Sequence, residues 1–428
     1  MLNGPIPATR RGARHHAQAV PELSANALLQ RFAGLPAAAP LLKRLSDAED
    51  VYLVGGAVRD LLTGVEPLDL DLVVDGELEP VARRLGTPAR VHDRFETRTV
   101  RLDGATLDLA RARRERYEHP GALPTVGPAG IDEDLGRRDF TVNALALGLS
   151  GSRRGALLEV PHGREDVATG RLRVLHDASF IDDPTRLVRL ARYAGRLGFS
   201  IEEHTRALAR AAVASGALET VSGPRIGAEL RLLAEQARPV DGLRILHELG
   251  LDEAIAPGFG IGTDERAQVA RRALALLPVD GAPADLLLAV AGLDVPGDRL
   301  AGLLDRLAFP AGRRDRIVAA ASRAREVAER LRTAREPSQI AAAAGAGPVE
   351  LVALAGAMGA EPAAVRWLQE LRHVALEIDG SDLLAAGLAP GPAVGAGLAA
   401  ARAAKLDGRA VGREAELAEA VRAARAYG

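Results

Sequence analysis

The sequence predicts a protein of the α+β class, with an α/β head built on a mixed sheet and an all-helical neck, body and tail. Short β-rich runs alternate with helical and turn signals from Asp50 to about Arg173. Beyond Asp183, apolar residues recur with a helical period of about 3.6 residues as far as the end of the chain. A length of 428 residues exceeds what one compact core usually holds, which indicates two or more domains.

These changes of pattern predict five segments. Residues up to Val20 contain no acidic residue and several Arg and His, and they are typical of a frayed terminus rather than of a transit peptide or a phosphate-binding arm. We expect an N-terminal tail with a leading helix, a head, a neck, a body and a tail at residues 1–48, 49–176, 177–240, 241–330 and 331–428.

Within the head, the runs at residues 51–54, 70–74 and 97–102 have the apolar and β-branched composition of strands. The segment from Tyr117 to Gly130 contains three prolines and three glycines, which are too many for a regular element, so we expect a mobile loop there. In the helical half, we expect breaks near Gly216, Gly223-Pro224, Pro257-Gly258, residues 281–283, residues 345–348 and residues 387–392.

The composition excludes some classes of protein. Because 57 acidic residues offset 55 basic ones, there is no global positive field, and any RNA-binding surface has to be local. The absence of cysteine excludes disulfides and cysteine-ligated zinc. No apolar run reaches the roughly 18 residues of a membrane span, and the N-terminus lacks a signal-peptide core. We therefore expect a cytoplasmic protein.

A pair of glycines, Gly55 and Gly56, joins the first expected strand to a short helix that ends near Gly64. The exposed amides and the positive dipole end of such a helix bind phosphate, and Arg59 adds a charge-assisted contact. The turn thus predicts a triphosphate site. The alternative, which Gly-Gly alone would favour, is an ordinary strand-to-helix turn.

Two carboxylates follow, with Asp69 and Asp71 two residues apart and therefore on one face of the next expected strand. Phosphoryl transfer uses such a pair to hold two metal ions, and Mg²⁺ favours sparse carboxylate ligation. The alternative is a solvated strand face. Apolar neighbours on both sides instead favour a buried strand, where two like charges are costly without a cation.

Gly-Gly-x-x-Arg-Asp followed by Asp-x-Asp at this distance resembles the class II family of tRNA nucleotidyltransferases and bacterial poly(A) polymerases. The resemblance implies a DNA-polymerase-beta-like head. It also implies that Gly56 and Arg59 lie at the incoming nucleotide and that Asp69 and Asp71 bind the metal ions.

A second motif, at residues 134–144, resembles the segment with which this family grips the sugar and phosphates of the nucleotide, through Arg138 and Asp139. An Arg beside an Asp can bind a phosphate and a ribose hydroxyl together, so Asp139 would favour ribonucleotides. The alternative is a helix N-terminus in which Asp139 is the cap and Asn143 makes a structural bond.

A third motif places Asp183 and Arg186 one helical turn apart at the start of the helical half. Cytosine and adenine each present an exocyclic amine beside a ring-nitrogen acceptor, which a carboxylate and a guanidinium complement. Guanine and uracil present the opposite pattern, so the pair predicts acceptance of CTP and ATP. A structural alternative is an N-cap, since Pro184 follows Asp183.

This third motif resembles the family's Glu-Asp-x-x-Arg template, from which Arg189 and Arg192 also carry over as nucleotide-binding residues. Asp182 replaces the usual Glu. Asp108, on an expected neighbouring strand, is a candidate third carboxylate of the metal site. The resemblance covers residues 50–240 and, weakly, 378–392, while Pro224 replaces a usual acidic residue in a segment that we expect to be structural.

The expected activity is addition of CMP and AMP, from CTP and ATP, to the 3′ end of tRNA without a nucleic-acid template, by two-metal transfer with Mg²⁺. The expected partners are tRNA and the two nucleotides, with no membrane and no protein partner. Alternatives are addition of A alone, poly(A) synthesis, or a catalytically silent RNA-binding relative. The full-length segment from Tyr117 to Gly130 argues against CC-only addition, because the resemblance implies a disabled loop in that class.

Overall fold

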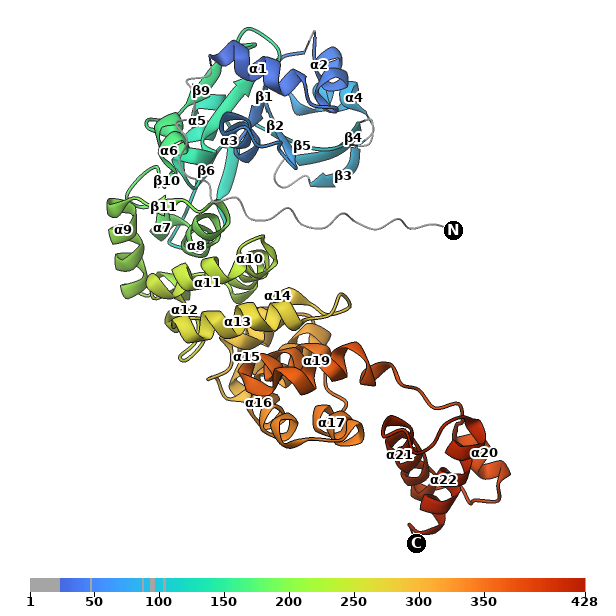
Figure 1. The fold of residues 1–428 in the computed structure, drawn as a ribbon. Helices are drawn as coiled ribbons and strands as arrows, with labels where there is room; N and C mark the ends of the chain where they lie inside the picture. The colour runs from blue at the N-terminus through green and yellow to red at the C-terminus, as the bar shows by residue number, and fades with distance from the viewer. Residues whose placement is uncertain (1–23, 47, 87, 93–96, 103–104, 428) are drawn as a thin grey trace. The chain divides into compact units, whose positions relative to one another are not determined.

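The chain forms two compact units, which divide after Val221 (Figure 1). This division falls inside residues 177–240, the segment expected as a neck, and the finer domain boundaries stay a prediction. The expected frayed terminus lies outside the described residues. The computed structural model describes residues 24–46, 48–86, 88–92, 97–102 and 105–427.

A seven-stranded sheet forms the centre of the first unit (Figure 1). Its strands are β1 (Asp50–Val54), β2 (Leu70–Asp75), β3 (Pro88–His92), β4 (Thr97–Leu102), β5 (Ala105–Arg111), β8 (Leu145–Gly148) and β9 (Leu157–Glu159). They lie in the order β3-β4-β5-β2-β1-β8-β9. The β2–β5 pair is parallel and the other pairs are antiparallel, which confirms the expected mixed sheet.

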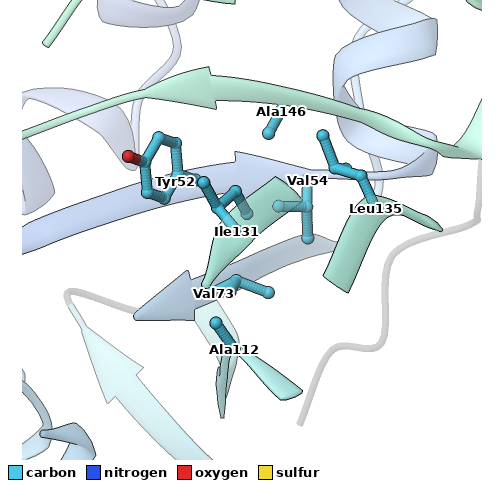
Figure 2. Packing of buried hydrophobic residues seen from close by; sticks show 7 residues of the cluster. All are labelled: Tyr52, Val54, Val73, Ala112, Ile131, Leu135 and Ala146. Atoms are coloured by element: carbon cyan, nitrogen blue, oxygen red, sulfur yellow. The ribbon is translucent and has the colours of Figure 1, made fainter. Parts of the chain in front are cut away.

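One face of this sheet packs against helix α5 (Ile131–Gly136). Because alternate side chains of a strand share a face, Tyr52 and Val54 of β1 both point toward this helix. Figure 2 shows them gathered with Ile131 and Leu135 of α5. The whole cluster is Tyr52, Val54, Val73, Ala112, Ile131, Leu135 and Ala146, all buried. Burial of these side chains fixes the end of α5, from which two arginines of the site continue.

The other elements of the first unit are mostly helices. Two short strands, β10 (Arg171–Leu172) and β11 (Ser200–Ile201), pair in parallel, so a two-residue strand interrupts the expected all-helical neck. Besides α5, the helices are α1 (Ala25–Ala33), α2 (Ala38–Arg44), α3 (Gly56–Thr63), α4 (Leu78–Leu85), η2 (Thr141–Asn143), α6 (Gly163–Thr169), α7 (Ser179–Asp182), α8 (Thr185–Leu197), α9 (Glu203–Ala214) and η3 (Ala217–Thr220).

The breaker-rich segment from Tyr117 to Gly130 is not an irregular loop throughout, and that expectation is wrong for its second half. Strands β6 (Arg113–Arg116) and β7 (Thr125–Pro128) pair as an antiparallel hairpin. A two-stranded hairpin tolerates glycine and proline because its outer edges have no further ladder to complete. In its turn, Gly121 has φ +72° and lies against Thr220, where a Cβ would come within 2.5 Å of the carbonyl oxygen. A glycine is therefore required there.

Within the described residues of the second unit, every regular element is a helix, as expected. The breaks predicted at glycine and proline from residue 257 onward lie between these helices, except that Pro283 and Pro392 are the first residues of the helices that follow. Gly223 and Pro224 likewise begin the first helix. The helices are α10 (Gly223–Glu235), α11 (Pro239–Glu248), α12 (Leu251–Ile255), α13 (Asp264–Leu276), α14 (Pro283–Ala291), α15 (Gly297–Arg306), α16 (Ala311–Thr333), α17 (Pro337–Ala344), α18 (Val349–Ala355), η4 (Gly356–Ala360), α19 (Glu361–Gln369), η5 (Leu371–His373), α20 (Gly380–Ala385), α21 (Pro392–Leu406) and α22 (Arg413–Arg425).

The only tryptophan of the chain, Trp367, lies in α19 and is 7% exposed. Among the described residues, no single helix has both the length and the apolar character needed to cross a membrane. One bent pair, residues 337–344 with 349–373, meets the two criteria only when its members are taken together.

Candidate functional site

The glycine turn lies where β1 ends and α3 begins. Gly55 has φ +69°, and its amide donates to the carbonyl oxygen of Leu145 at 3.0 Å. A Cβ on Gly55 would lie 3.0 Å from Nη1 of Arg138. The turn therefore needs glycine for its left-handed backbone, and the lack of a side chain lets Arg138 lie over it.

Arg59, which the sequence places at the nucleotide, is almost completely buried. Its Nε and Nη2 donate to Oδ1 of Asp60 at 2.9 and 2.7 Å, and its Nη1 donates to Oδ1 of Asn143 at 2.6 Å. The guanidinium of Arg59 therefore binds other side chains of the protein, and these contacts are structural.

The acidic pair is arranged differently from the expectation. Asp69 lies in the bend that precedes β2, which begins at Leu70, so only Asp71 belongs to the strand. The apolar residues on either side of the two aspartates are also not all buried, because Leu68 is 98% exposed while Leu70 and Leu72 are buried. The expected strand with two buried carboxylates is thus wrong in detail: both aspartates are exposed at the end of a buried strand.

Asp71 lies directly opposite Asp108 in the parallel β2–β5 pair, which confirms the neighbouring strand expected for Asp108. Burial by surrounding atoms raises the pKa of Asp71 although the residue keeps an accessible surface. Arg138 lowers this pKa, and Asp108 and Asp69 raise it further. Oγ1 of Thr99 donates to Asp108 at 2.7 Å. The site therefore concentrates negative charge around Asp71.

Two consecutive arginines at the end of α5 share one buried carboxylate. Asp134 accepts from Nη2 of Arg137 at 2.7 Å through Oδ1 and from Nη2 of Arg138 at 2.9 Å through Oδ2. Burial alone would raise the pKa of Asp134, but Arg138 and Arg137 bring it below its usual range. Arg137 also donates to Oε1 of Glu115 at 2.9 Å. Asp134 therefore orients both guanidinium groups.

Asp139 is held on both carboxylate oxygens. Its Oδ1 accepts from the amide of Phe140 at 2.9 Å and from Nδ2 of Asn143 at 3.0 Å. Its Oδ2 accepts from Nε and Nη2 of Arg189 at 3.0 and 2.6 Å. Burial alone would raise the pKa of Asp139, and Arg189 with Asn143 brings it below its usual range. The structural bond considered for Asn143 is confirmed, while η2 has Phe140 and not Asp139 as its N-cap.

The third motif begins α8. Oδ1 of Asp183 accepts from the amide and the hydroxyl of Thr185 at 3.1 and 2.6 Å. Asp183 thus stabilises the first turn, although it lies one residue before the assigned N-cap. Arg186 is buried and donates to Oγ of Ser179 and to the carbonyl oxygen of Arg137, both at 2.8 Å.

A cavity of about 320 Å³ brings most of these residues together. A second cavity, of about 430 Å³, shares Asp71 and Arg138 with the first and is also lined by Thr99 and Asp108. Asp69, Arg59 and Arg192 do not line the first cavity. The predicted residues that do line it are Gly55, Gly56, Asp71, Arg138, Asp139, Asp183, Arg186 and Arg189.

Several residues of the first cavity were not expected from the sequence. Tyr193 lies beneath three guanidinium groups of its own helix, including that of Arg189, whose Cζ is 5.6 Å from the ring centroid. Tyr117 comes from the β6–β7 hairpin, and burial together with Glu115 raises its pKa to about 12. Helical spacing from Arg189 was a usable signal for Tyr193. The sequence contains no such signal for Tyr117, because only the fold brings the hairpin to the cavity.

Comparison with known families matches two parts of the chain. Residues 51–173 match the model of the poly A polymerase head domain. Residues 198–260 match the model described as the probable RNA and SrmB- binding site of polymerase A.

Among curated proteins, the chain is similar over most of its length to a CC-adding tRNA nucleotidyltransferase of Deinococcus radiodurans, with 36% identity over 84% of this chain and 85% of that one. It is 41% identical to an A-adding tRNA nucleotidyltransferase of Halalkalibacterium halodurans over 50% of this chain. The chain spans 53% of that relative's length and about a quarter of two other A-adding relatives. Among solved structures, the Thermotoga maritima CCA-adding enzyme complexed with tRNA has a TM-score of 0.75, at 26% identity over 93% of this chain and 98% of that one.

Proposed function

Because the chain belongs to the tRNA nucleotidyltransferase and poly(A) polymerase family, we propose that it adds CMP and AMP to the 3′ end of tRNA, from CTP and ATP, without a nucleic-acid template. The observation that carries the proposal is the cavity in which Asp71, the glycine turn and the pair Asp183 and Arg186 meet. It combines an acidic group for phosphoryl transfer with groups that complement cytosine and adenine.

The residues around Asp71 fit a divalent metal ion. Its pKa is raised by burial and by two neighbouring carboxylates, so a cation at this point would relieve the repulsion. Asp69 and Asp71 would hold Mg²⁺, which when bound activates the attacking hydroxyl and stabilises the pyrophosphate. In the part of the chain that the structure describes, no three acidic, His or Cys side chains form a ready metal site, so the participation of Asp108 stays a prediction.

The remaining residues would hold the nucleotide. The amide of Gly56 and the guanidinium of Arg138 suit the phosphates, Gly55 leaves room for them because it has no side chain, and Asp139 suits the ribose. Asp183 and Arg186 suit the base edge of CTP and ATP, and Arg189 lies next along the same helix. Arg192 and Arg59, which lie off the cavity, would act on it through their neighbours.

Addition of the final A alone is a second candidate, because an A-adding relative is 41% identical over 50% of this chain. Three tRNA transcripts, ending before CCA, after CC and after CCA, distinguish the two when each is incubated with Mg²⁺ and with CTP, with ATP, or with both nucleotides together. We expect CTP and ATP to extend the first transcript to full CCA. If only the CC-ended transcript is extended, the protein adds A alone. If no transcript is extended, the proposed nucleotidyltransferase activity is refuted.

A further inference from the structure

Tyr117 places a phenol in the first cavity, and no motif of the sequence accounts for it. The residue follows strand β6 and lines this cavity together with Asp183 and Arg186. The turn of its hairpin is joined to the base-reading motif, because the amide of Gly121 donates to the carbonyl oxygen of Asp182 at 3.3 Å. The hairpin is therefore anchored beside the base-reading pair, and Tyr117 shares the space into which that pair opens.

The hydroxyl of Tyr117 has one hydrogen, and Glu115 accepts it. The phenol donates to Oε2 of Glu115 at 3.2 Å. Glu115 is 9% exposed and forms ion pairs with Arg113 and Arg137 at 3.2 and 2.9 Å, so it acts as a carboxylate, which accepts and does not donate. Burial together with Glu115 raises the pKa of Tyr117 to about 12, so the phenol keeps its proton at neutral pH. That proton therefore points toward Glu115.

The oxygen of Tyr117 still has acceptor positions for a ligand. A phenolic oxygen accepts as well as donates, and among the described residues no group donates to it. Tyr117 is half-buried. Beyond burial and Glu115, Arg186 lowers its pKa and Asp183 raises it, so the phenol lies within electrostatic reach of both. A ligand that enters the cavity therefore meets a hydrogen-bond acceptor at this point and not a donor.

The exocyclic amine of cytosine or adenine carries two hydrogens, which point to opposite sides of the amine. The carboxylate of Asp183 can accept one of them. The other hydrogen needs a second acceptor, because a donor that is withdrawn from water without a partner is costly. In guanine and uracil the same position is an oxo group, which is itself an acceptor and would be repelled by a second acceptor of the protein.

We propose that Tyr117, with its hydroxyl directed by Glu115, is a further specificity-determining residue that accepts the second amine hydrogen of CTP and ATP. The proposal rests on the proposed function. Asp183 and Tyr117 take one hydrogen each, and both reject an oxo group at the same position. The hairpin of β6 and β7 thus contributes to base selection in addition to α8.

The test removes the phenol from the protein and the amine from the nucleotide, separately and together. Purine riboside triphosphate is ATP without its exocyclic amine, and each nucleotide is offered with Mg²⁺ and a CC-ended tRNA transcript to the wild-type protein and to Tyr117→Phe. We expect the ratio of kcat/KM for ATP over the analogue to fall about fivefold in Tyr117→Phe, the effect of one hydrogen bond between neutral groups. The fall should come from ATP. Equal falls for both nucleotides would show that Tyr117 supports only the fold, and would refute the proposal.

Tyr52→Phe is the matched control. The hydroxyl of Tyr52 donates to Asp50 at 3.5 Å, and burial together with Asp50 raises the pKa of Tyr52 to about 12. Tyr52 lines neither of the two cavities that the described residues form. Its replacement removes a similar phenol–carboxylate contact away from the nucleotide, so the ratio of ATP over the analogue should stay unchanged. If Tyr117→Phe gives the same ratio as this control, the proposal is refuted.

Glu115→Gln tests the direction of the hydroxyl. A glutamine side chain can donate to the phenol as well as accept from it, so the hydroxyl hydrogen can turn toward the base. We expect the ratio of kcat/KM for ATP over GTP to fall, because a donor suits the oxo group of guanine. An unchanged ratio in a variant with a wild-type circular dichroism spectrum would show that Glu115 does not direct the hydroxyl. Tyr117→Phe decides the role of the phenol independently of this variant.

Calorimetric Kd values for ATP and the analogue provide a second reading that does not need transfer. If the wild-type protein binds ATP but extends no transcript, the proposed function fails. The ratio of the two Kd values in Tyr117→Phe then still decides the role of Tyr117, with a wild-type ratio refuting it. If the wild-type protein binds neither nucleotide, both proposals are refuted.

Discussion

Asp71 and Asp108 face each other across the only parallel strand pair among the described pairs of the seven-stranded sheet. Burial raises the pKa of Asp71, and its proximity to Asp108 and Asp69 raises it further. Such a carboxylate is unfavourable for the metal-free fold when it is ionised, because its folded pKa lies above its unfolded value. The same repulsion makes the site suited to a cation.

We therefore expect Asp71→Asn to abolish nucleotide addition, by about 10³-fold or more, and yet to raise the thermal midpoint at neutral pH without Mg²⁺ by roughly 1–2 °C. The stabilisation should disappear below about pH 4, where Asp71 is protonated in both states. Circular dichroism melts at several pH values, with and without Mg²⁺, measure this. Asp132→Asn, at a side chain that is 73% exposed, is the control. A variant that remains active would refute the metal assignment.

Asp134 provides a prediction of the opposite sign. Asp134→Asn leaves Arg137 and Arg138 without their buried anion, which should cost about 3 kcal/mol of unfolding free energy. The folded pKa of Asp134 is lowered, so its stabilisation is complete above the unfolded value near 4 and is lost only as the pH falls through the folded pKa. Urea unfolding followed by circular dichroism should thus show the largest difference at neutral pH. An equal difference at about pH 2.5 would contradict this.

Gly55→Ala should weaken nucleotide binding by more than the loss of folding stability alone would explain. Its φ of +69° is strained for alanine, and the new Cβ would lie 3.0 Å from Arg138, forcing the guanidinium to move. We expect KM for CTP to rise by about 10–100-fold, since a displaced charge-assisted contact is worth about 1.5–3 kcal/mol. Gly136→Ala is the control, because no atom lies within 4 Å of its Cβ position. Equal KM values in the two variants would refute this role of the turn.

Asp183→Asn tests the base-reading pair. Replacing one carboxylate oxygen by an amide nitrogen adds a donor, so we expect CTP and ATP to lose about 10–100-fold in kcat/KM while GTP and UTP change little. The amide oxygen can still accept from Thr185, so the start of α8 should persist. Competition between the four nucleotides on one transcript measures the selectivity. A uniform fall for all four would show that Asp183 acts only on the helix.

The residue types of the site were predictable from the sequence, because paired carboxylates, a glycine turn and an Asp-Arg pair each have a chemical signature. The α/β head and the helical second unit followed from hydrophobic periodicity, and the mixed sheet from the family resemblance. The pairing of Asp134 with the two arginines also lay within reach, at helical spacings of three and four residues.

The rest depended on contacts that are distant in sequence. Arg59 and Asn143 are 84 residues apart, and Asp139 and Arg189 are 50 apart, so no local pattern predicts that they meet. The sequence does not predict the hairpin of β6 and β7, because glycine and proline usually interrupt regular elements, although an isolated two-stranded ribbon accepts both.

The position of Trp367 has a practical consequence. The indole lies in the helical second unit, whereas every residue of the candidate site lies in the first. Its fluorescence emission therefore follows the unfolding of the second unit. The first unit, with the nucleotide site, can unfold while this signal is unchanged. A tryptophan placed at Tyr193 would give the first unit an optical reporter of its own.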